Sequence, residues 1–218
     1  MRRILVLATA LLSFSFFNVE AQEDVYRAKN FYHLLGMQGF SDNLLTMNFK
    51  LYEGYVKQTN LFISRLKELE KEGKVGSIEY VGIKRMFGFE YDGMRLHELY
   101  FENLGGKTPL AVKDALYQQI ERDFDSFEAW KKDFMATGMI RGVGWALLYF
   151  DPHAKRLFNV WINEHQMNEL AECKIILAMD VWEHAYITEY GIQRADYIDA
   201  FMRNIQWNIP SHRFSADL

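Results

Sequence analysis

The sequence predicts an α+β protein, in which an N-terminal helical hairpin lobe is followed by a small three-stranded antiparallel sheet packed with helices. Only three prolines occur among 218 residues, and because proline breaks helix interiors, their scarcity permits long helices. Helical patterns fill the first half of the chain, and strand-like segments begin after residues 138–144. Helices followed by strands indicate α+β rather than a doubly wound α/β sheet.

The first half is expected to hold a helical hairpin and two further helices. A helix should start at the Ser-Asp pair of residues 41–42, a favoured capping sequence, and run to residue 71. Glycines at 73, 76 and 82 should then end it. A second helix is predicted over 93–104, and two more over 110–124 and 126–137.

The second half is expected to combine a sheet with helices. Residues 145–150 and 156–162 are rich in aromatic and branched side chains and flank a turn that contains a proline. They therefore predict a β-hairpin. Residues 174–179 predict a short buried strand, and helices should return over 181–190 and 195–206.

Residues 1–21 are predicted to be a secretory signal peptide. A positive start precedes an apolar run over residues 4–17, and Val19 and Ala21 are small residues at the positions that precede cleavage. Cleavage after Ala21 would give an exported protein, periplasmic or secreted, with no membrane attachment. An uncleaved anchor is the alternative, although the run is short for a membrane span.

The remaining chain is expected to form two lobes that share a core, a helical hairpin lobe over 22–106 and an α+β lobe over 107–218. Hydrophobic residues make up 50% of the sequence and aromatic residues 16%, so a large core can be buried. The net charge is −4, and no basic block occurs. The composition therefore argues against a nucleic-acid partner.

The sharpest local pattern for a site is the segment from Asp180 to His184. The aspartate ends a predicted strand and the histidine follows four residues later, so the two side chains can converge. A carboxylate and an imidazole suit iron or manganese. An Asp helix cap followed by an ordinary histidine is the alternative that spacing alone leaves open. His97 lies beside an apolar helical stripe, where histidines are more often hydrogen-bonded core residues than ligands.

Several segments, in order along the chain, resemble the iron/manganese superoxide dismutase family. Residues 180–186 resemble the signature of that family, and residues 194–207 resemble the segment that follows it. A glycine–tryptophan turn at 142–146, a second-ligand helix at 97–104 and the first helix at 41–60 complete the resemblance. It spans nearly all of the chain after the signal peptide.

This resemblance implies a metal-dependent oxidoreductase, a superoxide dismutase with an antioxidant role. Its substrate would be superoxide, its products dioxygen and hydrogen peroxide, and its cofactor one iron or manganese ion per chain. The family holds its metal with three histidines and one aspartate. His97, Asp180 and His184 occupy matching positions in this sequence.

The remaining ligand position is where the chain departs from the family. A histidine belongs about two turns before Tyr55, where the sequence has Asn48, or Met47 one residue earlier. Asn48 is the better candidate because it shares a helix face with Tyr55. Ligation by its amide oxygen and a hydrogen bond to nearby backbone both stay open, and His33 is the only upstream histidine. The missing histidine also leaves open a catalytically impaired, noncatalytic metal-binding or interaction protein with the same fold.

The resemblance also implies roles for residues around the metal. Tyr55 matches a gateway tyrosine that guards the substrate funnel. His165 aligns with an outer-sphere residue that contacts the solvent ligand, or Gln166 does if the loop shifts by one, whereas a surface histidine is the alternative. Glu183 resembles the residue that bonds the metal-ligand histidine, His184, of a partner subunit. A homodimer through Glu183 and His184 is therefore expected.

Overall fold

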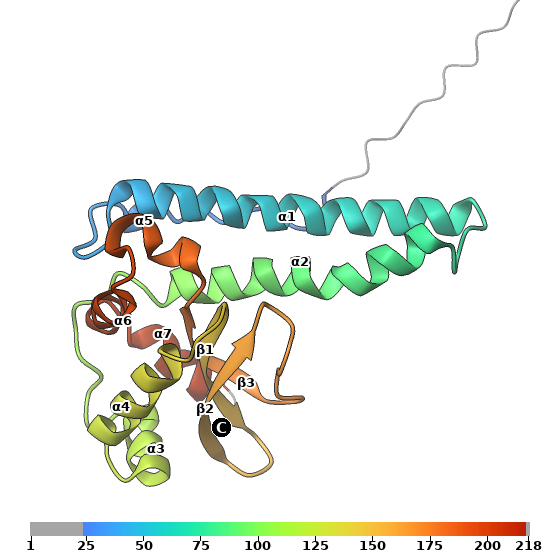
Figure 1. Cartoon of the computed structure of the whole chain (residues 1–218). Helices are drawn as coiled ribbons and strands as arrows, with labels where there is room; N and C mark the ends of the chain where they lie inside the picture. Colours follow the sequence, from blue (N-terminus) through green and yellow to red (C-terminus); the bar gives the residue numbers. More distant parts are fainter. Residues whose placement is uncertain (1–23, 217–218) are drawn as a thin grey trace, which may run out of the picture.

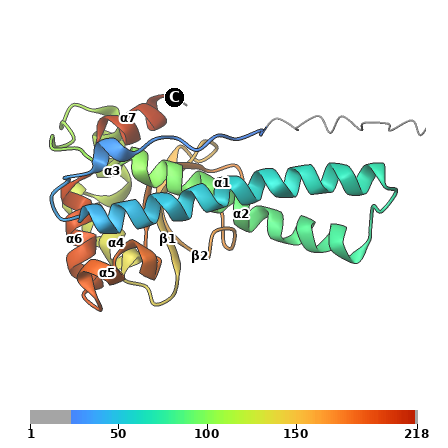
Figure 2. The same cartoon turned by 90° about the horizontal axis from the view of Figure 1, so that it is seen from above.

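A long antiparallel helical hairpin lies across an α+β lobe and projects beyond it (Figure 1; Figure 2). The computed structural model describes residues 24–216. The hairpin consists of α1 (Asp42–Lys71) and α2 (Ile78–Glu102). The predicted signal peptide at residues 1–21 lies outside the described residues. No helix within the described part of the chain is long and apolar enough to cross a bilayer.

Serine caps define where both hairpin helices begin. The Ser41 side chain accepts a hydrogen bond from the backbone N–H of Leu44, as expected for the predicted start of α1. Ser77 caps α2 in the same way, so α2 begins well before the predicted residue 93. The prediction was wrong here because Gly82 was taken as a break, whereas a helix tolerates a single glycine at a modest cost.

Gly93, another glycine inside α2, is required by the packing of α1 against α2. A Cβ atom at this position would lie 2.8 Å from Cδ1 of Tyr55 on α1. Such a distance is far inside van der Waals contact. The missing side chain therefore lets the Tyr55 ring pack directly against the backbone of α2.

Two short helices follow the hairpin, α3 (Ala115–Phe124) and α4 (Phe127–Gly138). The predicted helix at 110–124 starts later than expected because Asp114 caps it, its side chain accepting from the N–H of Leu116. The helix predicted over 126–137 is present. Both helices pack on the sheet, α4 on its first two strands and α3 on the second.

The sheet has three antiparallel strands, β1 (Gly144–Asp151), β2 (Arg156–Asn163) and β3 (Lys174–Asp180), with the order β2-β1-β3. The α+β class and the three-stranded antiparallel sheet predicted from sequence are confirmed. In the register of the central strand, Trp145 stands opposite Asp180. This pairing brings an aromatic ring and a candidate ligand to the same end of the sheet.

The chain after the sheet consists of short elements: the 3₁₀ turn η2 (Glu183–Ala185), α5 (Ile187–Tyr190), α6 (Arg194–Arg203) and α7 (Asn208–Ser215). The continuous helix predicted over 181–190 was wrong. Asp180 accepts the N–H of Trp182 and Tyr186 leaves helical geometry, so a turn separates η2 from α5. The predicted helix at 195–206 ends at Arg203, and α7 was not predicted.

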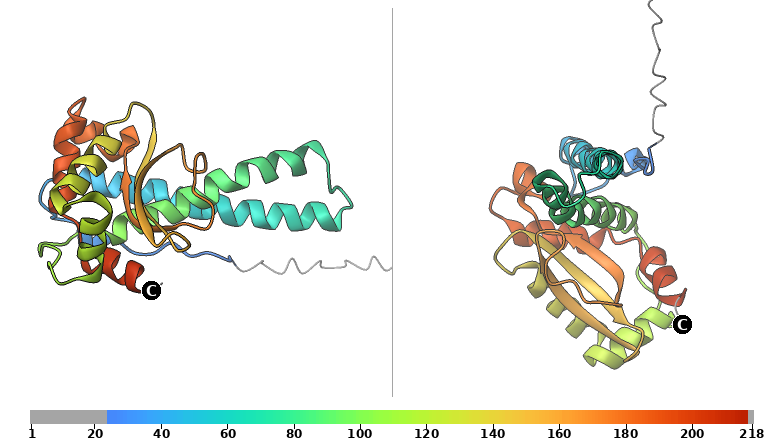
Figure 3. Two further views of the ribbon diagram at one scale, coloured as in Figure 1. Left: turned by 90° about the horizontal axis from the view of Figure 1, so that it is seen from below. Right: turned by 90° about the vertical axis from the view of Figure 1, so that its right-hand side faces the viewer.

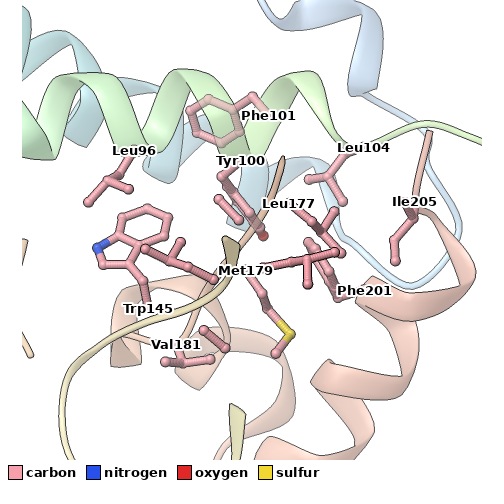
Figure 4. Packing of buried hydrophobic residues seen from close by; sticks show 14 of the residues in the cluster. Leu96, Tyr100, Phe101, Leu104, Trp145, Leu177, Met179, Val181, Phe201 and Ile205 are labelled. Carbon is pink, nitrogen blue, oxygen red and sulfur yellow. The ribbon is translucent and has the colours of Figure 1, made fainter. Parts of the chain in front are cut away.

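The main core lies where α2, the sheet and α6 meet (Figure 4). Leu96, Tyr100 and Phe101 of α2 are buried there together with Trp145 of β1 and Phe201 of α6. Figure 3 shows the sheet below the helical hairpin, with α3 and α4 on its other side. This core holds α2 and the end of β3 together, and both elements carry a candidate ligand.

Candidate metal centre

Two histidines and one aspartate converge from three elements. His97 comes from α2, Asp180 from the end of β3, and His184 from η2. Oδ2 of Asp180 lies 3.1 Å from Nε2 of His184 and 3.5 Å from Nε2 of His97. The two Nε2 atoms are 3.4 Å apart. The three residues predicted as ligands are therefore brought to one point.

Hydrogen bonds to the backbone aim the first two of these side chains. Nδ1 of His97 lies 2.6 Å from the carbonyl oxygen of Gly93, and because a carbonyl only accepts, Nδ1 carries the hydrogen. The lone pair of His97 is then on Nε2, which faces the other two residues. Oδ1 of Asp180 accepts from the N–H of Trp182 at 2.9 Å, which leaves Oδ2 for the histidines.

The electrostatics favour the protonation states that metal binding requires. Burial lowers the pKa of His97 to about 4, against the opposing effect of Asp180. Burial alone would raise the pKa of Asp180, but the neighbouring His184 and His97 outweigh it and lower that pKa. At neutral pH the site thus combines a neutral imidazole at His97 with an ionised carboxylate, which are the ligand forms.

The donor set fits a metal ion. All three candidate donor atoms lie within 4.8 Å of one another, and no other group of three or more His, Cys, Asp or Glu residues within 24–216 meets this criterion. His97 and Asp180 are fully buried, whereas the side chain of His184 is 27% exposed. Two imidazole nitrogens with one carboxylate oxygen suit iron and manganese.

A second layer of hydrogen bonds surrounds the three residues. His165 is completely buried; its Nδ1 accepts from Nε1 of Trp145 at 3.0 Å, and its Nε2 lies 2.9 Å from Oη of Tyr55. Burial lowers the pKa of His165 to about 3, so the ring is neutral. Burial likewise raises the pKa of Tyr55, which keeps its hydroxyl protonated.

The structure thus separates the alternatives left open for this loop. His165 is not a surface residue, because it is buried and lies between Trp145 and Tyr55, with a hydrogen bond to each. Gln166 does not join this hydrogen-bond chain, and its Oε1 is buried without a partner. Trp182 stacks on His165 and His184, with ring centroids 4.8 and 5.7 Å away.

Phe89 lines the site, although the sequence analysis did not predict it. Its ring centroid lies 4.7 Å from that of His165 and 6.1 Å from that of Tyr55. The residue precedes His97 by about two helical turns, so a correctly placed start of α2 would have put both on one helix. The error in the start of α2 concealed this signal.

One of the two residues considered for the remaining ligand position, Asn48, is a buried polar residue. Asn48 on α1 is 3% exposed, and its Oδ1 has no hydrogen-bond partner. Met47 is 41% exposed, so it faces solvent rather than the core. His33 lies in an exposed 3₁₀ turn before α1 and outside the group of converging donors.

Fold and site together define a class: an α+β metalloprotein whose described residues form one buried site of two histidines and one aspartate. Residues 112–213 match the family model described as iron/manganese superoxide dismutases, C-terminal domain. An iron superoxide dismutase of Cupriavidus metallidurans is 38% identical over 83% of this chain and 91% of the relative.

Two further proteins extend the comparison. A manganese superoxide dismutase of Haloferax volcanii is 36% identical over 80% of this chain and 86% of its own length. An iron superoxide dismutase of Pyrobaculum aerophilum is 31% identical over 78% of this chain and 81% of its own length. The chain therefore belongs to the iron/manganese superoxide dismutase family. The predicted enzyme class, an oxidoreductase with one iron or manganese ion per chain, is confirmed.

Proposed function

We propose that His97, Asp180 and His184 hold the metal ion and that superoxide is disproportionated to dioxygen and hydrogen peroxide beside them. The observation that carries this assignment is the convergence of their donor atoms within 4.8 Å, in a buried site with matching protonation states. When bound, iron or manganese supplies the one-electron redox chemistry. Ionised Asp180 contributes negative charge that favours the higher oxidation state, and the neutral imidazole of His97 adds no charge of its own.

Tyr55 is proposed to hold a proton at the mouth of the reaction site. The indole N–H of Trp145 can only donate, so Nδ1 of His165 accepts and its Nε2 carries the hydrogen. That hydrogen is donated to Oη of Tyr55. The hydroxyl hydrogen of Tyr55 therefore remains available to donate to an anion such as superoxide, and formation of peroxide requires protons.

The test combines elemental analysis with a superoxide assay on the purified protein. About one iron or manganese atom per chain and measurable dismutation are expected, and His184→Ala should lose both. His33→Ala is the matched control, because His33 is exposed and lies outside the converging group. A folded wild-type protein that binds no metal and is inert would overturn the proposal.

A homodimer through Glu183 and His184 is proposed as the functional unit. Glu183 is exposed and directly precedes His184, which is partly exposed. Nearby Ile187 is an apolar residue that is 45% exposed. A second copy would cover this surface and give Glu183 an imidazole partner. Sedimentation should show a dimer for the wild type and monomers for Glu183→Ala, whereas an unchanged dimer would contradict this interface.

We further propose that the protein is exported, to the periplasm or outside the cell, on the strength of the signal-like pattern of residues 1–21. Cell fractionation followed by N-terminal sequencing tests this. A mature protein that begins at Gln22 and is found outside the cytoplasm is expected. An intact N-terminus in the cytoplasmic fraction would refute it.

A further inference from the structure

Asn48 is a buried polar residue on the first helix of the hairpin. It lies in the interior of α1 with 3% of its surface exposed, and its amide oxygen Oδ1 is buried without a hydrogen-bond partner. Buried carbonyl oxygens almost always have a partner, and each exception requires an explanation. A metal ion would supply one.

The helix face of Asn48 is the face that meets the metal site. Asn48 precedes Tyr55 by seven residues, so at about 100° per residue the two lie within roughly 20° of each other around α1. The ring centroid of Tyr55 is 5.2 Å from that of His97. Asn48 therefore shares the side of α1 from which Tyr55 reaches the ligand histidine.

The level of Asn48 along the hairpin also matches. On α1, Phe49 packs against Phe101 of α2 with centroids 5.1 Å apart, whereas Tyr55 packs against Gly93. His97 lies midway between these two α2 residues, one turn from each. The α1 segment between Phe49 and Tyr55 thus faces the turn of α2 that carries His97. Asn48 directly precedes this segment, at the end that packs against Phe101.

Contacts from the other side complete the placement. α1 also packs against η2, the turn that carries His184. The same helix therefore borders both histidine-bearing elements. Of the other two candidates for this position, Met47 faces solvent and His33 is exposed before the helix. Asn48 is left as the buried donor that α1 offers.

We infer that Oδ1 of Asn48 is the fourth protein donor of the metal centre, in place of an imidazole. The inference rests on the proposed metal site of His97, Asp180 and His184. An amide oxygen is a hard, neutral donor that suits manganese or iron. It is weaker than imidazole, so the protein should retain its metal less firmly than a protein with three histidines would.

The experiment compares Asn48→Leu, which keeps the approximate size of the side chain, with Thr59→Val as matched control. Thr59 lies on the same helix, is fully buried and also has a side-chain oxygen without a partner. The metal-free proteins are titrated with Mn²⁺ in competition with a chelator. The electron paramagnetic resonance spectrum of the bound Mn²⁺ and the unfolding of the metal-free proteins are recorded as well.

Asn48→Leu is expected to raise the Kd for Mn²⁺ by about tenfold or more and to alter the resonance spectrum. Its metal-free form should be at least as stable as the wild type, because an unpaired carbonyl has been removed. Thr59→Val should leave Kd and spectrum unchanged. A Kd and spectrum of Asn48→Leu equal to those of the wild type would overturn the inference. His184→Ala separates the two proposals, because unchanged Mn²⁺ binding by that variant would instead overturn the proposed metal site.

Discussion

His165 and Tyr55 are joined by a hydrogen bond of 2.9 Å between Nε2 and Oη, although 110 residues separate them in sequence. The indole of Trp145 fixes the direction of this bond, because it can only donate to Nδ1. The buried imidazole is therefore held as a single tautomer. One ring, supplied by a loop, links the sheet to the tyrosine of α1.

Tyr55→Phe should weaken both stability and activity. The change leaves the Nε2–H of His165 buried without an acceptor, so the free energy of unfolding should fall by about 1–3 kcal/mol. Dismutation should fall about tenfold or more, since outer-sphere partners typically matter by that amount. Denaturant unfolding and a superoxide assay measure the two effects. Tyr149→Phe, which alters a buried tyrosine of β1, should leave the rate per bound metal unchanged; equal losses in both variants would contradict a specific role for Tyr55.

His165→Gln and His165→Leu should differ sharply. A glutamine oxygen can accept from Trp145 while its amide group donates to Tyr55, so activity should stay within a few-fold of the wild type. Leucine satisfies neither neighbour and should reduce dismutation by about 10–100-fold. Steady-state assays normalised to metal content make the comparison. Similar activities for the two variants would show that the hydrogen-bond chain is not needed.

Glycine-to-alanine changes at two positions of α2 should have opposite signs. Gly93→Ala places a Cβ 2.8 Å from the Tyr55 ring and should destabilise the protein by about 1–3 kcal/mol through overpacking. A Cβ atom at Gly82 would meet no neighbouring part of the molecule within 4 Å, so Gly82→Ala should stabilise by about 0.5–1 kcal/mol. Urea unfolding measures both values. A neutral or stabilising Gly93→Ala would mean that Tyr55 can move away freely.

Asp92→Asn should stabilise the protein at alkaline pH. Burial, with a smaller effect of Glu169, raises the pKa of Asp92 from 3.8 to about 7. The native state then keeps this proton where the unfolded state has lost it, so stability falls as pH rises from about 4 to 7. At pH 8 the variant should gain about 2 kcal/mol, less than the full shift implies because solvent screens the group. At pH 4 the gain should vanish. Denaturant unfolding curves of the variant and the wild type at both pH values measure the effect, and an equal gain at pH 4 and pH 8 would contradict the prediction.

The parts of the fold that sequence predicts well are those governed by local signals. Ser41 caps its helix as expected, the helix predicted over 126–137 is present, and the turn between β1 and β2 places the hairpin correctly. The start of α2 was missed because Gly82 was taken as a break, so the helix was predicted to begin only at Gly93. Gly93 is explained only by the approach of Tyr55 from another helix, and no local pattern contains that information.

The site shows the same division. Asp180 and His184 are close in sequence, and their convergence is a matter of spacing. The burial of His165 could be established only in three dimensions, because it depends on Trp145, Tyr55 and Trp182, which come from separate elements. The 3₁₀ turn η2 likewise arises after the Asp180 side chain caps the chain that follows β3.

The distribution of the donors along the chain has a consequence for how the protein matures. His97 and His184 are separated by 87 residues, and Asp180 reaches its place only when β3 pairs with β1 in the register that sets it opposite Trp145. The helical hairpin by itself carries His97 and Asn48 but not the anionic donor of the site. We therefore expect metal capture to follow, rather than nucleate, chain collapse. Once bound, the ion stabilises by mass action only the state in which the hairpin and the sheet are packed together. It therefore holds together parts of the chain that are distant in sequence, at a late stage of folding.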